Sequence, residues 1–295
     1  MTGSTTPRRA LLVANPGSRR GSAALRPVES VFAERGIDLI PIDTAERETL
    51  TDRLCDQTHG ADLIVAVGGD GTANSVAAAT FRTGLPLGLI PAGTANDLAR
   101  TLGLPLDPAE AARVIAAGQL KAIDLGEVNG AFFFNVASLG LSVKLADKLS
   151  STSKKRWGRL GYLWALLRAL AEARPFHAAI TGEDGHTILV KTLQIAVGNG
   201  RHYGGGMVVE QGADINDGQL DLYSLEFKAV WKLLAIAASF PTGHHGLSPE
   251  VRTLRGRRFE IATRRAKPIN MDGELLGATP AIFTVHPAAI RMIVP

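Results

Sequence analysis

The 295-residue chain is 45% hydrophobic and 20% charged, a composition typical of a globular protein with its own core. Its net charge of +4 suits anionic partners such as nucleotides or acidic lipids, without choosing among them. The single cysteine, Cys55, excludes a disulfide framework and a cysteine-rich zinc site within one chain, which favours a reducing cytoplasm.

The N-terminal part of the chain alternates short apolar runs with helical runs. Strands are expected over 10–16, 37–44, 61–69 and 85–93, and the helices that follow them over 23–36, 46–60, 71–82 and 96–103. Alternation at this spacing favours parallel βαβ units. The sequence therefore predicts an α/β domain over residues 1–125.

The pattern changes after Asp124. Short β-rich runs separated by turns cover most of residues 126–295, interrupted by helical runs near 157–173 and 227–240. This pattern is typical of a mainly antiparallel β domain, which we expect over 126–295. The longest apolar helical stretches fall short of the roughly 20 residues needed to cross a bilayer, so we expect contact with a membrane at most.

Glycine-rich polar loops follow three of the predicted strands. They are "ANPGSRRG" with Asn15, "VGGDGTAN" with Gly68 to Asn74, and "PAGTAND" with Gly93 to Asn96. In parallel βα units, ligands bind at the carboxyl ends of the strands, where the free N–H groups of the next helix attract phosphate. One such loop is more often an ordinary turn, but three at successive strand ends favour a phosphate ligand.

Two common nucleotide motifs are absent from the sequence. There is no G-x-x-x-x-G-K-[ST], which excludes a P-loop protein, and no G-x-G-x-x-G after a strand, which disfavours a Rossmann cofactor domain.

Two motifs resemble those of the diacylglycerol kinase catalytic family, in its bacterial soluble lipid kinase branch. They are "GGDGTANSVA" (68–77) and "LGLIPAGTANDLAR" (87–100). The GGDG signature of the first is shared with NAD kinases and phosphofructokinases, whereas the G-T-x-N-D-x-A-R pattern of the second is typical of the lipid kinases. Further matches are "NPGS", residues 122–142, "VGNGRHYGGGM", "DGQLDL" and "MDGE", so the resemblance spans nearly the whole chain. One departure is "EQGA" (210–213), where a proline-containing segment is expected.

The resemblance implies an α/β nucleotide-binding domain like that of phosphofructokinase and NAD kinase, a C-terminal β-sandwich domain, and catalysis in a cleft between them. It implies ATP and Mg²⁺ as cofactors. The nucleotide-binding set would be Asn15, Thr44, Gly68, Gly69, Asp70, Gly71, Thr72, Asn74, Gly93, Thr94 and Asn96.

Three carboxylates are the candidate catalytic groups. Asp70 would organise Mg²⁺ and the triphosphate, although an aspartate there also suits a cap of the following helix. "MDGE" has the composition of an Asp-Gly hairpin turn, and the resemblance adds Glu274 as general base with Asp272 beside it in the Mg²⁺ network.

A second metal site is also implied by the resemblance. Asp217 matches the aspartate of a structural Mg²⁺ site, whose other ligands would be the backbone carbonyls of Asp214 and Gln219. Oxygen ligands suit a hard cation, but an Asp-Gly turn without metal explains the sequence equally well.

These observations predict a cytoplasmic lipid kinase of phospholipid metabolism, associated peripherally with the membrane, where its lipid substrate lies. The basic start of 154–173 and the seven basic residues of 252–267 suit an anionic surface, or are simply solvated. A kinase of a soluble hydroxyl acceptor such as NAD, and a nucleotide-binding regulator, remain alternatives. A homodimer is left open, and no nucleic-acid partner is expected, since no reader motif is present.

Overall fold

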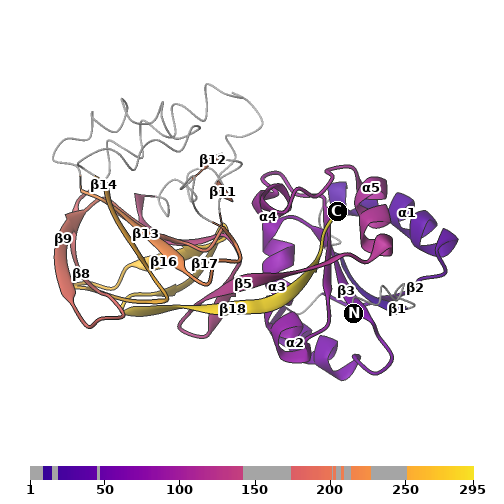
Figure 1. The fold of residues 1–295 in the computed structure, drawn as a ribbon, viewed down its shortest axis with the longest axis horizontal. Coiled ribbons are helices and arrows are strands. Elements are labelled where there is room, and N and C mark those ends of the chain that lie inside the picture. The colour runs from indigo at the N-terminus through magenta and orange to yellow at the C-terminus, as the bar shows by residue number, and fades with distance from the viewer. Residues whose placement is uncertain are drawn as a thin grey trace. The chain divides into compact units, whose positions relative to one another are not determined.

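A computed structural model describes residues 9–14, 19–44, 47–141, 174–200, 202–203, 207–208, 214–226 and 251–295. The chain divides into two compact units (Figure 1). The first unit comprises 1–125, 204–206 and 286–295, and the second comprises 126–203 and 207–285. The helical runs predicted near 157–173 and 227–240, like Asn15, lie outside the described residues.

A parallel sheet forms the centre of the first unit. Its strands lie in the order β2 (Asp38–Pro41), β1 (Arg9–Ala14), β3 (Leu63–Gly68), β4 (Leu87–Pro91). The end of β18 (Ala281–Ile293) lies parallel beside β4, with Met292 opposite Leu87. Every residue of β3 is buried, as expected for a parallel strand covered on both faces.

Helices cover both faces of this sheet. They are α1 (Arg19–Glu34), α2 (Arg47–Asp56), α3 (Asp70–Thr83), α4 (Asp97–Thr101) and α5 (Pro108–Ala117). α1 and α5 pack together on one face, with Phe32 and Ile115 fully buried there, and α2 packs with α3 on the other (Figure 1). The predicted α/β fold of the N-terminal part is thus confirmed, whereas α5 is a helix that the sequence interpretation omitted.

Antiparallel strands build the second unit, which the chain enters through β5 (Leu120–Val128). One sheet has the order β14-β13-β10-β7-β16-β17, and the other has the first part of β18, then β15, β8 and β9. The strands are β6 (Ala131–Phe133), β7 (Val136–Gly140), β8 (Phe176–Thr181), β9 (Thr187–Thr192), β10 (Gln194–Gly198), β13 (Leu220–Leu225), β14 (Val251–Gly256), β15 (Arg258–Thr263), β16 (Pro268–Met271) and β17 (Glu274–Ala278), with a short pair β11 (His202–Tyr203) and β12 (Met207–Val208). Phe133, Leu222 and Phe283 belong to one buried cluster contributed by both sheets, which confirms the predicted antiparallel β domain.

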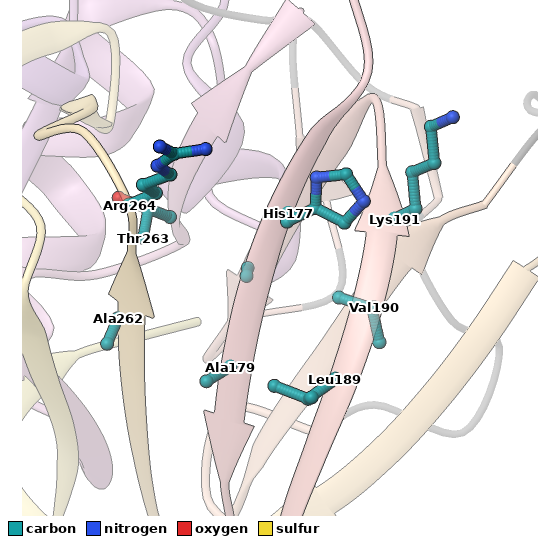
Figure 2. Close-up of a pocket in the computed structure, with 9 residues that line it drawn as sticks. His177, Ala179, Leu189, Val190, Lys191, Ala262, Thr263 and Arg264 are labelled. Carbon is teal, nitrogen blue, oxygen red and sulfur yellow. The ribbon is translucent and has the colours of Figure 1, made fainter.

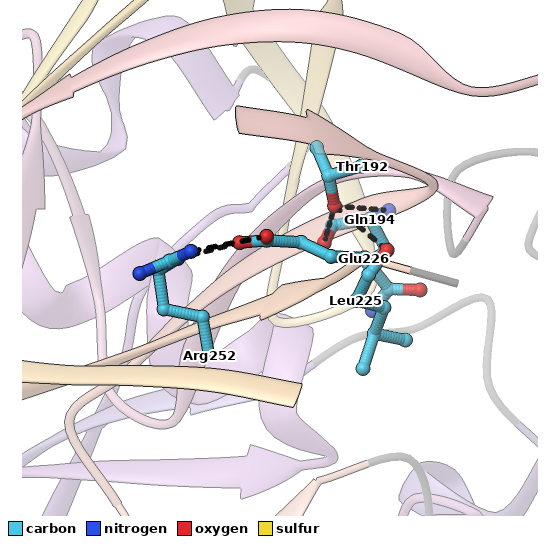
Figure 3. A network of polar contacts seen from close by, with 5 residues as sticks. All are labelled: Thr192, Gln194, Leu225, Glu226 and Arg252. Atoms are coloured by element: carbon cyan, nitrogen blue, oxygen red, sulfur yellow. Dashed lines mark hydrogen bonds and ion pairs between the residues drawn. The ribbon is translucent and has the colours of Figure 1, made fainter. Parts of the chain in front are cut away.

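Polar contacts tie three chain segments together in the second unit (Figure 3). The buried hydroxyl of Thr192 donates to the carbonyls of Gln194 and Leu225, at 2.8 and 3.0 Å. Beside them, Arg252 makes a two-pronged ion pair with Glu226, at 2.6 and 3.2 Å. The hydrogen bond to Glu226 raises the pKa of Arg252 above its ordinary value. These contacts hold together the two chain positions that flank 227–250.

No helix in the described ranges is both long enough and apolar enough to cross a membrane.

Candidate active site

Two glycine loops of the first unit touch through their backbones. A Cβ atom on Gly93 would lie 2.5 Å from the Cα of Gly69, and one on Gly69 would lie 3.0 Å from the Cα of Gly93. A Cβ on Gly68 would lie 2.1 Å from the hydroxyl oxygen of Thr72. None of these glycines has a left-handed φ, so close approach, and not backbone conformation, explains the residue type.

Asp70 joins the same two loops. It is the first residue of α3, but its Oδ1 accepts a hydrogen bond of 3.0 Å from the N–H of Leu98, in the first turn of α4. The alternative interpretation is that Asp70 caps the helix that follows it, α3. It is wrong, because the carboxylate accepts from the first turn of α4 and α3 has no side-chain cap. Within the described residues, Oδ2 of Asp70 has no hydrogen-bond partner, so this oxygen is available to a ligand.

Asn96 shapes the second loop. Its Oδ1 accepts from the N–H of Gly93 at 2.9 Å, and its Nδ2 donates to the Gly93 carbonyl at 3.3 Å. The residue itself has a left-handed φ of 52°, which asparagine tolerates better than most residues. The loop is thus fixed by one side chain before α4 begins.

The carboxyl ends of the parallel strands bring most of the predicted nucleotide set to one edge. The hydroxyl of Thr44 donates to the carbonyl of Ala14 at 3.2 Å, which connects the end of β1 with the segment after β2. The N–H of Ala92 donates to the Gly68 carbonyl at 2.8 Å, which connects β3 with β4. Thr94 is exposed at this edge, and Oδ1 of Asn74 is enclosed with no hydrogen-bond partner in the described structure.

In the second unit, Asp272 and Gly273 form the predicted hairpin turn between β16 and β17. Met271 pairs with Glu274, and the two turn residues have φ values of 47° and 97°. Positive φ at both central positions is the mark of a type I′ turn. Glu274 is the first residue of β17 and is half-buried.

The carboxylate of Asp272 accepts three backbone hydrogen bonds. Oδ2 accepts from Phe134 at 2.6 Å, and Oδ1 accepts from Asn135 and Val136, each at 3.0 Å. Both oxygens are therefore engaged by successive N–H groups, an arrangement that stabilises a negative charge. Asp272 holds the turn that carries Glu274 against the segment between β6 and β7.

Buried asparagines surround this turn, and the sequence interpretation missed them. Asn135 and Asn270 are 2% and 3% exposed, and Oδ1 of Asn135 and Nδ2 of Asn270 have no partner in the described part of the chain. Asn199, 3% exposed, donates to the carbonyl of Phe134 at 2.9 Å. A buried amide without a partner is costly, so these atoms mark a place for a water or ligand. The available signal was a lone asparagine inside an apolar run, as in "FFFNVA".

The chain matches two family models. Residues 9–128 match the diacylglycerol kinase catalytic domain, and residues 135–294 match the YegS C-terminal NAD kinase beta sandwich-like domain. A Mycobacterium tuberculosis protein named diacylglycerol kinase is 32% identical over 296 residues, which cover 95% of this chain and 93% of the relative. The chain belongs to the diacylglycerol kinase family.

Further relatives and solved structures support the assignment of this chain to the diacylglycerol kinase family. A Pseudomonas fluorescens protein named as a candidate YegS-like lipid kinase is 35% identical over 80% of this chain and 78% of its own. A crystal structure of a candidate diacylglycerol kinase from Bacillus anthracis superposes with a TM-score of 0.84 at 26% identity, covering 100% and 98% of the two chains. An Archaeoglobus fulgidus NAD kinase in complex with ATP shares the fold alone, with a TM-score of 0.52 at 13% identity over 97% of this chain and 92% of that one.

The metal site that the diacylglycerol kinase resemblance implies lies at the turn before β13. Oδ1 of Asp217 accepts from the N–H of Gln219 at 2.9 Å, and Oδ2 accepts from the guanidinium of Arg255 on β14. The N–H of Asp217 donates to the Asp214 carbonyl at 3.4 Å. The available ligand atoms are oxygens, but in this arrangement the Asp217 carboxylate already binds the guanidinium of Arg255, which a metal ion would have to displace. The second Mg²⁺ stays a prediction.

No cluster of three or more histidine, cysteine, aspartate or glutamate side chains in the described ranges is arranged to hold a metal ion. A cation at Asp70 would therefore need oxygens from elsewhere, such as the phosphates of a nucleotide. This is the usual situation of Mg²⁺ in phosphoryl transfer, where the ion keeps few protein ligands.

Proposed function

We propose that this member of the diacylglycerol kinase family is an ATP- and Mg²⁺-dependent lipid kinase. It would transfer the γ-phosphate of ATP to a hydroxyl of a diacylglycerol-like lipid. The observation that carries the proposal is the pair of touching glycine loops held together by Asp70, whose Oδ2 remains available. Bare backbone beside an available carboxylate is what a Mg²⁺–triphosphate requires.

The proposal divides the chemistry between the units. In the first unit, the loops at Gly69 and Gly93 bind the phosphates, and Asp70 holds Mg²⁺, which when bound offsets the negative charge of the transferring group. In the second, Glu274 accepts the proton of the acceptor hydroxyl. The bond from the γ-phosphorus to ADP breaks, a bond to the acceptor oxygen forms, and ADP leaves. Asp272 acts by holding the turn.

A lipid acceptor is favoured over NAD by the second glycine loop and by the relatives. Residues 93–100 follow the lipid kinase pattern, and the curated relatives at 32% and 35% identity are named for diacylglycerol or lipid phosphorylation. The NAD kinase neighbour shares the fold alone. A cytoplasmic enzyme with such an acceptor would associate with the membrane peripherally.

The test is transfer of label from γ-labelled ATP with Mg²⁺ into a bacterial lipid extract dispersed in mixed micelles. A parallel reaction offers NAD as acceptor. We expect label in the chloroform phase with wild type, and a loss of at least about tenfold with Asp70→Asn, because the cation loses its charged ligand.

Asp52→Asn is the matched control, since Asp52 is an exposed residue of the same unit that pairs with Arg82. It should keep wild-type activity. Label in NADP alone would establish the soluble-acceptor alternative, and ATP binding without transfer to either acceptor would establish the regulator.

A further inference from the structure

The outer face of β9, β8 and β15 in the second unit combines cationic and apolar side chains. The strand register places Lys191 opposite His177, Leu189 opposite Ala179, and Ala179 opposite Ala262. Side chains alternate across a strand, and the residues between these positions, such as Val190, are buried. The five side chains therefore share one solvent-facing surface, which we call the outer face.

A hollow of about 460 Å³ lies on the outer face (Figure 2). The small side chains of Ala179 and Ala262 leave this hollow open. Leu189 lines its side, and 82% of the surface of Leu189 is exposed. Arg264, directly after β15, joins His177 and Lys191 at one end, as Figure 2 shows. No aspartate or glutamate is among the residues that line the hollow.

Ion pairs distinguish two arginines at the start of the basic run 252–267 from Arg264. Arg252 pairs with Glu226, and Arg255 pairs with Asp217, so these guanidinium groups are already compensated. Neither Arg264 nor Lys191 has an ion-pair partner in the described part of the chain. The uncompensated positive charges of the outer face therefore gather at one end of the hollow.

Acidic groups near this face lie away from that end. Glu260 shares the face but is 3.7 Å from Arg258, which pairs with it. Glu183 and Asp184 are in the turn between β8 and β9, at the opposite end of these strands from His177 and Lys191. The face is thus polarised, positive at one end and apolar in the middle.

We propose that the outer face docks onto a bilayer that contains anionic phospholipid. Leu189 enters the interfacial region, and Lys191 and Arg264, with His177 between them, face the lipid phosphates. An almost fully exposed leucine beside uncompensated cations is the combination that binds peripheral proteins to acidic membranes. The small alanine residues let headgroups approach the sheet.

Charge and surface chemistry favour a membrane over other anionic occupants. A small soluble anion would gain nothing from contact with Leu189. Single-stranded nucleic acid stacks its bases on several aromatic side chains, but His177 is the only aromatic ring among the residues that line the hollow. The choice of a bilayer also rests on the proposed function, because a kinase with a lipid acceptor must reach the membrane.

The test is co-sedimentation of the full-length protein with vesicles, without ATP. One set is phosphatidylcholine alone, and the other is an equal mixture of phosphatidylcholine and phosphatidylglycerol. We expect binding to the mixed vesicles only. The double variant Lys191→Ala/Arg264→Ala should bind about thirtyfold more weakly, and Leu189→Ser about tenfold more weakly.

Matched controls change the same chemistry on the first unit. Arg26→Ala/Arg35→Ala removes the same charge from exposed positions, and Leu120→Ser changes a leucine that is 52% exposed. These variants should bind as wild type does. All substitutions are at exposed positions, and thermal unfolding checks that each variant is folded.

Kinase activity in detergent micelles separates this proposal from the proposed function. Loss of vesicle binding by the outer-face variants, with micelle activity kept, supports the docking face. The proposal is overturned if the control variants weaken vesicle binding as much as the outer-face variants do. It is also overturned if the wild-type protein binds neutral and mixed vesicles equally. A protein that binds mixed vesicles through this face but phosphorylates no lipid would overturn the proposed function and leave the docking face standing.

Discussion

At the scale of single residues, Gly93 is where the backbone leaves no space for a side chain. An alanine there would place its Cβ 2.5 Å from the Cα of Gly69, and backbone cannot move aside as a flexible side chain can. We expect Gly93→Ala to destabilise the protein by about 1–3 kcal/mol, the usual cost of overpacking. It should also weaken ATP binding, since the two loops must separate.

Denaturant unfolding and nucleotide titration measure the two effects of Gly93→Ala. Gly256→Ala is the control, because a Cβ at Gly256 would make only an ordinary contact, 3.5 Å from the ring of Phe259. If Gly93→Ala has the same unfolding midpoint and the same ATP affinity as the control, neither stability nor nucleotide binding depends on the close approach of the two loops.

Glu274 is the residue on which the proposed proton transfer depends. A general base contributes roughly 10²–10⁴-fold to the rate, so Glu274→Gln should lower kcat by at least about tenfold while ATP still binds. Steady-state kinetics in mixed micelles measure this, with the exposed Glu183→Gln of the same unit as control. A near wild-type kcat for Glu274→Gln would assign the proton to another acceptor.

Residue types were predictable, but their partners were not. The glycines and Asp70 could be located from the sequence because loops after parallel strands share an edge. That Asp70 contacts Leu98, 28 residues away, and that Asp272 contacts N–H groups 136 to 138 residues away, depends on how distant segments pack. The buried amide of Asn135 was missed although its place inside the apolar run "FFFNVA" was a signal; only its unpaired oxygen depends on distant packing.

At the scale of elements, the sequence around α5 contains start and stop signals of a helix that the sequence analysis did not use. Asp107 accepts from the N–H groups of Ala109 and Glu110, each at 3.0 Å, and Pro108 and Gly118 bracket the helix. These are ordinary start and stop signals of a helix. The helix predicted over 96–103 forms only over Asp97–Thr101, since Asn96 belongs to the second glycine loop and the chain leaves the helix at Leu102 and Gly103, where Gly103 has a left-handed φ of 67°.

The cap of α5 gives a measurable prediction. Asp107→Ala should cost about 0.5–2 kcal/mol of stability, because two N–H groups lose their acceptor. Asp107→Asn is the control, since asparagine caps equally well. Urea unfolding compares the three proteins, and equal midpoints for wild type and Asp107→Ala would mean that the cap contributes nothing.

The turn before β13 tests the second metal site. In wild type the guanidinium of Arg255 neutralises Asp217, so added Mg²⁺ should not change the stability of this turn. The substitution Arg255→Ala leaves the Asp217 carboxylate open to a metal ion, so Mg²⁺ should raise the melting temperature of this variant. Melting with Mg²⁺ and with a chelator measures both proteins, without nucleotide. Wild type stabilised by Mg²⁺, with Asp217→Asn insensitive, would instead establish a resident cation at this turn.

At the scale of the whole molecule, the two fold classes followed from local patterns, but strand partners did not. Alternating strands and helices indicated a parallel sheet, and short β runs indicated an antiparallel one. β18 belongs to both patterns: Phe283 pairs with Phe259 in the second unit, and Met292 lies beside Leu87 in the first. Between these two positions lie His286 and Pro287, and Ala288 has a positive φ of 51°, so the change of partner coincides with an interruption of the regular strand. A proline inside a strand pattern is the local signal of such an interruption, but it does not say which strands lie on either side.

Nucleotide binding should stabilise the molecule through the first unit alone. A ligand at a hundredfold its Kd stabilises the folded state by about 2.7 kcal/mol, which corresponds to a rise of roughly 5–10 °C in Tm. We expect this with Mg²⁺–ATP and not with AMP, because the loops at Gly69 and Gly93 would contact the terminal phosphates.

Asp70→Asn separates phosphate recognition from general nucleotide binding. If Oδ2 of Asp70 holds the cation, the variant should lose most of the shift caused by Mg²⁺–ATP, whereas Asp52→Asn should keep it. Differential scanning fluorimetry with ATP, ADP and AMP measures all three proteins. An equal shift with AMP and ATP would mean that the site reads the nucleoside, and the glycine loops would then need another explanation. A shift that depends on the terminal phosphates and on Asp70 is what a phosphoryl-transfer site requires of its ground state.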